Sequence, residues 1–273
     1  MEFLTTIILA VAQGIAEFLP ISSSGHLLVL GCWFGVDVEQ NLTLNVVLHA
    51  GTLLAILIYY FRKILSILLD HDRRRLIALV IAGSVPAAVV GVFLKLKKLD
   101  EVLFSSPWVA AGGFLFTGIM LLSIFGRPWK KNTADARELE AVEKMSFCQA
   151  LLIGCAQAFA ILPGVSRSGS TISCGVLCRL RKADAAEFSF LLAIPAIGGA
   201  ALLELLDAFK VSVMPGTGEI LNLSLGFAVA AVSGYISLAV LIKVLQKGKL
   251  GWFALYLFAA AAITITVECV KYF

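Results

Sequence analysis

The chain has 273 residues, of which 60% are hydrophobic and only 15% are charged, and its mean hydropathy is +0.95. This composition excludes a soluble globular domain, and the sequence lacks the alternation of apolar and polar residues expected of a membrane β-barrel. The net charge of +4 gives no sign of a nucleic-acid partner, and we expect none. The chain is therefore predicted to be an all-α polytopic membrane protein whose main partner is the lipid bilayer.

The first half of the chain, residues 1–126, is predicted to form one repeat. Its five apolar segments lie at roughly 2–19, 27–36, 42–61, 76–94 and 106–126. The second segment is too short to cross a bilayer core, because a helix rises only about 1.5 Å per residue. We therefore pair it with the segment before it as a re-entrant helical hairpin over residues 2–36, which leaves three transmembrane helices.

A polar stretch, residues 127–145, separates this half from the second one and is predicted to be a cytoplasmic linker. The second repeat, residues 146–273, again contains five apolar segments, at roughly 146–162, 171–181, 186–206, 221–243 and 251–270. Its short second segment predicts another re-entrant hairpin, over residues 146–182, followed by three transmembrane helices.

One sequence pattern occurs in both halves. AQGIAEFLPISSSGHL at residues 12–27 aligns without a gap with AQAFAILPGVSRSGST at residues 156–171, and the same offset of 144 residues relates 44–52 loosely to 188–196. Because each half contributes an odd number of crossings, the second copy should enter the membrane in the opposite orientation. These features predict an inverted-topology repeat of two five-segment halves, whose two hairpin tips meet at one site.

The distribution of Lys and Arg predicts how the chain is oriented. The side reached after the first full crossing receives Arg62, Lys63, Arg73, Arg74, Arg75, Arg127, Lys130, Lys131, Arg137, Lys144, Arg179, Arg181, Lys182, Lys243, Lys247 and Lys249. The opposite side receives only Lys95, Lys97, Lys98, Lys210 and Lys271. The positive-inside rule makes the first side cytoplasmic and puts both termini outside. The same distribution would arise if both arms of each hairpin crossed fully, so six and ten crossings both stay open.

The first hairpin carries polar side chains that an apolar segment would not need. Gln13 and Glu17 are four residues apart and share a helix face, and a carboxylate within the membrane usually marks a functional site or a paired charge. Small polar residues follow at the tip: Ser22, Ser23, Ser24 and Gly25. Hydroxyls and amides at a helix start can bind an anion, although such a sequence can also be a simple helix cap. The next residue, His26, could act as a base, an acid or a nucleophile.

The second tip carries a cation in the corresponding place. Arg167 lies within an apolar half, where it needs an anionic partner, and its planar guanidinium suits a phosphate. The alternative is an ion pair between Arg167 and Glu17 that locks the two halves together. The polar and small residues around Arg167 that could help to bind an anion are Gly164, Ser166, Ser168, Gly169 and Thr171. On the third segment, Asn45 and His49 lie one turn apart and could line the same site.

Together these residues resemble the undecaprenyl-diphosphate phosphatase family of the bacitracin-resistance type. The family pattern of Glu or Gln, three residues and then Glu matches Gln13 to Glu17, and its Pro-x-Ser-Ser-[Ser/Thr]-Gly-His matches 20–26. Its Pro-Gly-x-Ser-Arg-Ser-x-x-Thr matches 163–171 at every fixed position. The second copy has Ile161 in place of Glu17 and a serine in place of His26, so it lacks the acid–base pair.

The resemblance implies an integral membrane hydrolase of the bacterial cytoplasmic (inner) membrane. It would remove the terminal phosphate of undecaprenyl diphosphate, at a site open toward the periplasm or outer side, to give the monophosphate carrier used in peptidoglycan assembly. We predict that Arg167 clamps the phosphates and that Ser23, His26 or a water is the nucleophile. Glu17 would orient His26 or hold a divalent cation, Mg²⁺ or Ca²⁺. A homodimer is an open alternative to a monomer.

A transporter is the competing class of protein. Inverted repeats with broken helices are a transporter architecture, and a polyprenyl-phosphate flippase would also need a buried arginine, with Glu17 as its coupling proton site. An enzyme releases phosphate in detergent without a gradient, whereas a pure transporter does not.

Overall fold

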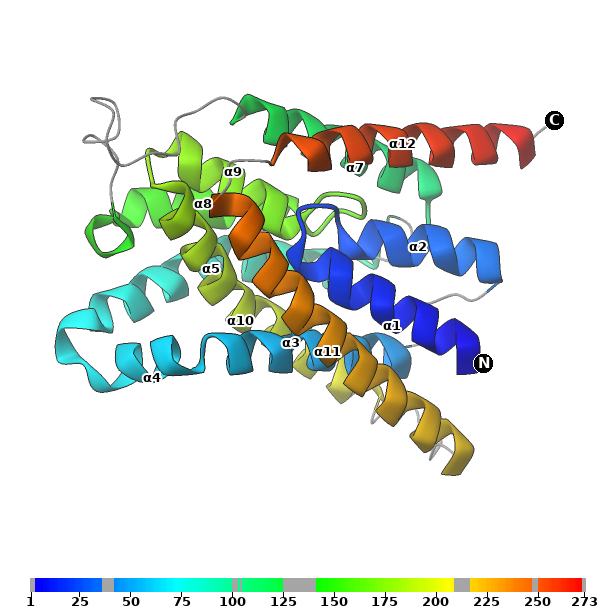
Figure 1. The fold of residues 1–273 in the computed structure, drawn as a ribbon, viewed down its shortest axis with the longest axis horizontal. Coiled ribbons are helices and arrows are strands. Elements are labelled where there is room, and N and C mark those ends of the chain that lie inside the picture. The colour runs from blue at the N-terminus through cyan, green and yellow to red at the C-terminus, as the bar shows by residue number, and fades with distance from the viewer. Residues whose placement is uncertain are drawn as a thin grey trace.

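The computed structural model describes residues 3–35, 42–99, 103, 105–124, 141–208, 217–246 and 250–271. The described residues form eleven α-helices, with short 3-10 turns between some of them (Figure 1). Their bounds are α1 (Phe3–Phe18), α2 (Ser23–Phe34), α3 (Leu42–Tyr59), α4 (Phe61–Leu69), α5 (Arg74–Leu96), α7 (Pro107–Ser123), α8 (Phe147–Phe159), α9 (Arg167–Leu177), α10 (Lys182–Ala208), α11 (Thr217–Gln246) and α12 (Gly251–Lys271). The prediction of an all-helical chain is confirmed.

Two short helical pairs occupy the places of the predicted hairpins. α1 contacts α2 and α8 contacts α9, and each pair is interrupted by a few non-helical residues, at 19–22 and at 160–166. α2 and α9 have 12 and 11 residues, so each is only about 17–18 Å long, well short of a bilayer core. Each pair is therefore a helical hairpin whose second arm is too short to cross.

The longer helices supply the membrane spans. By length and composition, α5, α10, α11 and α12 can each cross a membrane, and α3 with α4 makes a fifth span if the bent pair counts as one. α7, the remaining predicted crossing, has 17 residues and is shorter than the predicted segment 106–126. These helices make the chain a multi-pass membrane protein.

The bend between α3 and α4 was not predicted. The two helices meet at Tyr60 with an angle of 68°. In α4, Phe61, Leu65 and Leu68 are exposed while Ile67 is buried, and basic residues follow Phe61 directly. A short helix that mixes exposed apolar and basic side chains suits the membrane–water interface better than the bilayer core, so the chain turns there.

Each hairpin packs against a helix of the other half. α1 packs against α11, α8 packs against α5, and α3 packs against both α10 and α11. The helix backbones approach closely because glycines, which have no side chain, lie at the contacts. A Cβ on Gly154 of α8 would lie 2.2 Å from the carbonyl oxygen of Gly83 on α5, and a Cβ on Gly14 of α1 would lie 2.7 Å from the amide nitrogen of Gly234 on α11. The halves are thus interleaved by small residues, as in many membrane helix contacts.

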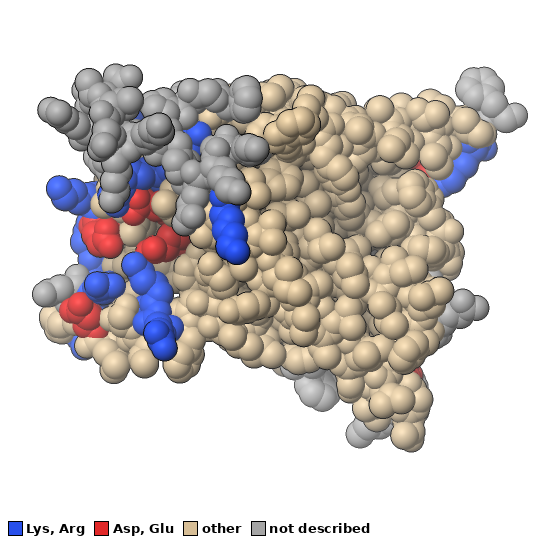
Figure 2. Space-filling view, in the orientation of Figure 1, with Lys and Arg blue, Asp and Glu red and all other residues tan. Residues whose placement is uncertain are grey.

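Charged side chains gather at one end of the molecule. On the face in Figure 2, Lys, Arg, Asp and Glu cluster at the end where α4 lies, and an almost uncharged band separates them from the opposite end. The N and C marks both lie at that opposite end in Figure 1. Large apolar side chains such as Ile81, Val89 and Ile119 are exposed on the helices between the ends, as a lipid-facing surface requires. Of the predicted linker, residues 127–140 lie outside the described part of the chain.

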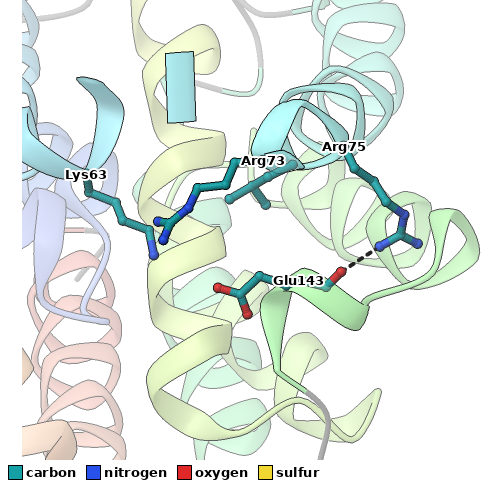
Figure 3. Close-up of a pocket in the computed structure, with 5 residues that line it drawn as sticks. Lys63, Arg73, Arg75 and Glu143 are labelled. Atoms are coloured by element: carbon teal, nitrogen blue, oxygen red, sulfur yellow. Dashed lines mark hydrogen bonds between the residues drawn. The ribbon is translucent and has the colours of Figure 1, made fainter. Parts of the chain in front are cut away.

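A small cavity of about 50 Å³ opens at the charged end (Figure 3). Its lining residues are Lys63, Arg73, Arg75, Leu76 and Glu143. Each cation there already has a partner: Lys63 with Glu187 at 2.8 Å, Arg73 with Asp70 at 3.2 Å, and Arg75 with the carbonyl oxygen of Glu143 at 2.7 Å. The Arg75 bond fastens the end of the linker to α5, and the Lys63 bond joins α4 to α10, so we regard this cavity as a structural junction.

Candidate active site

The two hairpin tips are in direct contact. A Cβ on Gly25 of α2 would lie 2.8 Å from the Cα of Gly164 and 2.6 Å from the ring of Phe114, so only hydrogen fits there. Across the same junction, the hydroxyl of Ser168 donates to the carbonyl oxygen of Leu19 at 3.3 Å. The prediction that residues of the two tips come together is therefore correct.

A buried ion pair lies at this junction. Nη2 of Arg167, the first residue of α9, lies 2.7 Å from Oε1 of Glu17 in the last turn of α1, and their side chains are only 13% and 7% exposed. The other carboxylate oxygen, Oε2, accepts hydrogen bonds from the hydroxyl of Ser23 at 2.6 Å and from Nε2 of Gln13 at 3.2 Å. Three of the predicted site residues thus converge on the carboxylate of a fourth, and the ion-pair alternative describes the structure as it stands.

The start of each short helix is capped in the same way. The Ser22 hydroxyl accepts from the amide of Gly25 at 3.3 Å, and the Ser166 hydroxyl accepts from the amide of Gly169 at 3.1 Å. Ser22 and Ser166 are therefore N-caps, as the capping alternative predicts, and the repeat extends to individual hydrogen bonds. Each cap also contacts the serine two residues later: Ser22 with Ser24 at 3.4 Å and Ser166 with Ser168 at 3.2 Å.

Both helix N-termini face the ion pair. Ser23 and Arg167 are the first residues of α2 and α9, and both bind Glu17 through their side chains. The amide ends of two helices, each with partial positive charge, therefore meet beside one guanidinium. Amide donors and a guanidinium in a buried junction can stabilise a phosphate, a diphosphate or the charge that develops during phosphoryl transfer.

Two of the predicted glycines pack against α7. Gly164 has a φ of 82°, and a Cβ there would lie 2.0 Å from the carbonyl oxygen of Ala110. A Cβ on Gly169 would lie 2.8 Å from Cγ2 of Thr117, whose hydroxyl accepts from the amide of Ser166 at 2.9 Å. In this structure these glycines let the second tip approach α7 closely, which positions Arg167.

Thr171 supports the arginine from behind. Its hydroxyl donates to the carbonyl oxygen of Arg167 at 2.7 Å and lies 2.5 Å from the hydroxyl of Ser189 on α10. The carbonyl oxygen of Ser189 also accepts from Nη1 of Arg167 at 3.4 Å. Ser189 was missed in the sequence, although the offset of 144 residues pairs it with Asn45, the polar residue noted on the third segment.

His26, in the first turn of α2, has partners of its own. Its Nδ1 lies 2.7 Å from the carbonyl oxygen of Ser22, and its Nε2 lies 2.6 Å from the hydroxyl of Tyr256 on α12. Glu17, which was predicted to orient His26 or to hold a divalent cation, is not among these partners: it binds Arg167, Ser23 and Gln13 instead. Tyr256 was also missed, because a single tyrosine in the apolar segment 251–270 is indistinguishable by pattern from a lipid-facing one.

The donors available for a cation are few. In the part of the chain that the structure describes, no group of three or more His, Cys, Asp or Glu residues could hold a metal ion. The junction offers the carboxylate of Glu17 and the amide oxygen of Gln13, which is buried without a hydrogen-bond partner. Mg²⁺ commonly binds through one or two carboxylates plus substrate phosphates, so this pair of oxygens fits a cation that arrives with its substrate.

Comparison with known proteins gives matches along nearly the whole chain. Residues 6–263 match the family described as bacitracin resistance protein BacA. The undecaprenyl-diphosphatase of Rhodopirellula baltica is 43% identical over 267 residues, 98% of this chain and 98% of that protein. The undecaprenyl-diphosphatase of Rubrobacter xylanophilus is 37% identical over 276 residues, 96% of this chain and 97% of that protein. The undecaprenyl-diphosphatase of Trichlorobacter lovleyi is 38% identical over 270 residues, 95% of each protein. The family match contains the first hairpin from residue 6 onward and the whole of the second.

Proposed function

Because the chain belongs to the bacitracin resistance (BacA) family, we infer that it is an integral membrane phosphatase. It hydrolyses undecaprenyl diphosphate to undecaprenyl phosphate and inorganic phosphate, which returns the lipid carrier to peptidoglycan synthesis. The observation that supports this chemistry best is the junction of two helix N-termini with Arg167 and Glu17. Phosphoryl transfer needs little more than positioning and stabilisation of negative charge, and this junction supplies both.

Arg167 and the two helix N-termini would hold the diphosphate. In the substrate-free protein the guanidinium binds Glu17, so the incoming phosphate oxygens replace or share that contact. The bidentate geometry of a guanidinium matches two phosphate oxygens, which a lysine could not match. The lipid tail would extend along the apolar outer surface of the helices, where it gains affinity from apolar contact.

Ser23 is the nucleophile that the contacts favour. Its hydroxyl donates to Glu17 at 2.6 Å, which is within reach for proton transfer. The Ser23 oxygen would bond to the terminal phosphorus as its proton passes to Oε2 of Glu17, and the bond to the bridging oxygen would break to release undecaprenyl phosphate. Water would then hydrolyse the phosphoserine. A water or His26 as nucleophile would leave no phosphoserine, so trapping of labelled phosphate on Ser23 distinguishes the routes.

A divalent cation is a further part of the proposal. Glu17 and Gln13 would hold Mg²⁺ or Ca²⁺ together with the substrate phosphates, and the cation would neutralise part of their charge. The unpartnered amide oxygen of Gln13 supports this role. Phosphate release in the presence of a chelator, followed by addition of either metal, measures the requirement.

The proposed topology is an inverted repeat. The exchange of partners, in which α1 packs on α11 and α8 packs on α5, supports it, as does the matching pair of serine caps. We propose that the hairpins are re-entrant, that the charged end faces the cytoplasm, and that the termini and the active site face the outer side of the cytoplasmic membrane. Labelling of single cysteines in intact cells with membrane-impermeant and membrane-permeant reagents tests the orientation. Light scattering in detergent distinguishes a monomer from a homodimer.

Phosphate release by detergent-purified protein tests the function. Wild type, Arg167→Ala and His26→Ala are assayed with undecaprenyl diphosphate, beside Arg73→Ala as a control for loss of an arginine at the charged end. We expect release by wild type and the control, and loss of release in the other two variants. Correctly folded wild type that released no phosphate would instead favour a transporter in which Arg167 and Glu17 bind and couple the substrate.

A further inference from the structure

Tyr256 brings α12 to the active site. Its hydroxyl lies 2.6 Å from Nε2 of His26, although the two residues are 230 positions apart in the sequence. The rings also lie nearly parallel, with an angle of 9° between their planes and 5.6 Å between their centroids. On α7, the ring of Phe114 lies 5.1 Å from the imidazole. The imidazole is therefore held by one hydrogen bond at each nitrogen and by two aromatic rings.

These contacts define the tautomer of His26. The carbonyl oxygen of Ser22 can only accept, so Nδ1 at 2.7 Å must carry a proton. In the neutral imidazole Nε2 is then the acceptor, and the hydroxyl of Tyr256 donates to it. Ser22 makes this possible with an unusual backbone conformation, φ 69° and ψ 103°, in which its carbonyl also accepts from the amide of His26 at 3.3 Å. Backbone strain of this kind is concentrated at functional sites.

Tyr256 also covers one nitrogen of His26. The residue is 46% exposed on the outside of α12, whereas His26 is only partly accessible. Its hydroxyl occupies the one imidazole nitrogen that can accept a proton from a reacting group. A ligand oxygen that is to exchange a proton with His26 must first take the place of this hydroxyl.

We propose that Tyr256 is a positioning residue for His26. Its hydroxyl keeps the proton of the imidazole on Nδ1. It also blocks access to the basic nitrogen, Nε2, until substrate displaces the phenol. When Nε2 takes a proton from an O–H group of a reacting ligand, that O–H bond breaks as the N–H bond forms. The imidazolium then donates a hydrogen bond from Nε2 to a substrate oxygen or to the oxygen of Tyr256. This role rests on the proposed function, in which removal of the His26 side chain abolishes phosphate release.

The Tyr256→Phe variant tests the proposal, because it removes the hydroxyl and keeps the stacked ring. Tyr235→Phe on α11 is the matched control, since Tyr235 is 43% exposed and contacts the ring of Tyr59. We expect kcat of Tyr256→Phe to fall about tenfold, as for loss of one well-aligned hydrogen bond. KM should change by less than about twofold, because the ring and the anion-binding residues stay in place. The control should keep wild-type kcat.

A chemical probe that does not depend on turnover completes the test. Diethyl pyrocarbonate modifies the unprotonated imidazole nitrogen, and peptide mass spectrometry separates His26 from His49 and His71. His26 should react severalfold faster in Tyr256→Phe than in wild type or the control. Unchanged kcat together with unchanged reactivity of His26 would overturn the proposal. If wild type released no phosphate, the phosphatase assignment would fail, but the reactivity of His26 would still report whether Tyr256 covers it.

Discussion

The two hairpin tips share a scaffold but differ in the chemistry of their side chains. In both, a serine caps a short helix and contacts a second serine two residues later. The first tip presents Glu17, Ser23 and His26, whereas the corresponding positions of the second are Ile161, Arg167 and Ser170. The two turns are thus similar in their serine caps, while the carboxylate and the imidazole lie on one and the guanidinium on the other. In the proposed mechanism, a chain with two copies of either tip would lack half of the groups that the reaction needs.

Removing the cation should have the largest effect. We expect Arg167→Ala to lower kcat/KM by about 100- to 1,000-fold, as for other groups that stabilise developing charge. It should also lower the free energy of unfolding by about 3–5 kcal/mol, because Glu17 would stay buried without its partner. Phosphate release and thermal unfolding in detergent separate the two effects, with Arg73→Ala as control. A folded Arg167→Ala protein with near-normal turnover would contradict the division of roles.

Removing the hydroxyl that faces Glu17 should have the next largest effect. We expect Ser23→Ala to lower kcat about 100-fold, the lower range for loss of a positioned proton-transfer group, because Glu17 could still activate a water. Ser123→Ala is the matched control, since its hydroxyl only bonds the carbonyl oxygen of Met120 at an exposed position. Phosphate release under single-turnover conditions measures the difference. Equal rates in the two serine variants would show that the first tip does not depend on Ser23.

The second tip should be intolerant of a side chain at Gly164. We expect Gly164→Ala to lower the free energy of unfolding by about 2 kcal/mol, because its φ is 82° and a Cβ would lie 2.0 Å from the carbonyl oxygen of Ala110. At Gly112, where a Cβ would meet nothing within 4 Å, the same substitution should be neutral or slightly stabilising. Denaturation in detergent measures the free energy of unfolding of both variants. Similar values for the two would contradict a steric requirement for glycine at 164.

The caps themselves should respond in opposite directions. We expect Ser22→Gly to raise the free energy of unfolding by about 1 kcal/mol, since glycine relieves the positive φ of 69° at a small loss of capping. Ser166 has an ordinary φ of −73°, so Ser166→Gly should lower stability by about 0.5 kcal/mol. Equal stability changes would mean that the first tip holds no strain.

The main features of the fold were predictable because they follow from composition. Segment length and the repeated pattern predicted both helical hairpins, and a cation and an anion in the two copies made the pair between Glu17 and Arg167 one of two alternatives, beside phosphate binding by Arg167. The first turns of α2 and α9 include residues that the pattern assigned to loops, because serine capping starts each helix early. Tyr256 and Ser189 were not predictable as site residues, since their roles depend on which helices pack together. The bend at Tyr60 depends on where the chain meets the membrane–water interface, and the length of an apolar segment does not show that position.

The ion pair at the junction bears on product inhibition. Glu17 already occupies Arg167 in the resting protein, so any anion must compete with a carboxylate that is tethered in place and therefore present at high effective concentration. A lipid diphosphate carries more charge and more oxygens for that competition than the monophosphate left after hydrolysis. We expect the carboxylate to return to the guanidinium as soon as the terminal phosphate departs, which would keep the accumulating carrier lipid from blocking turnover.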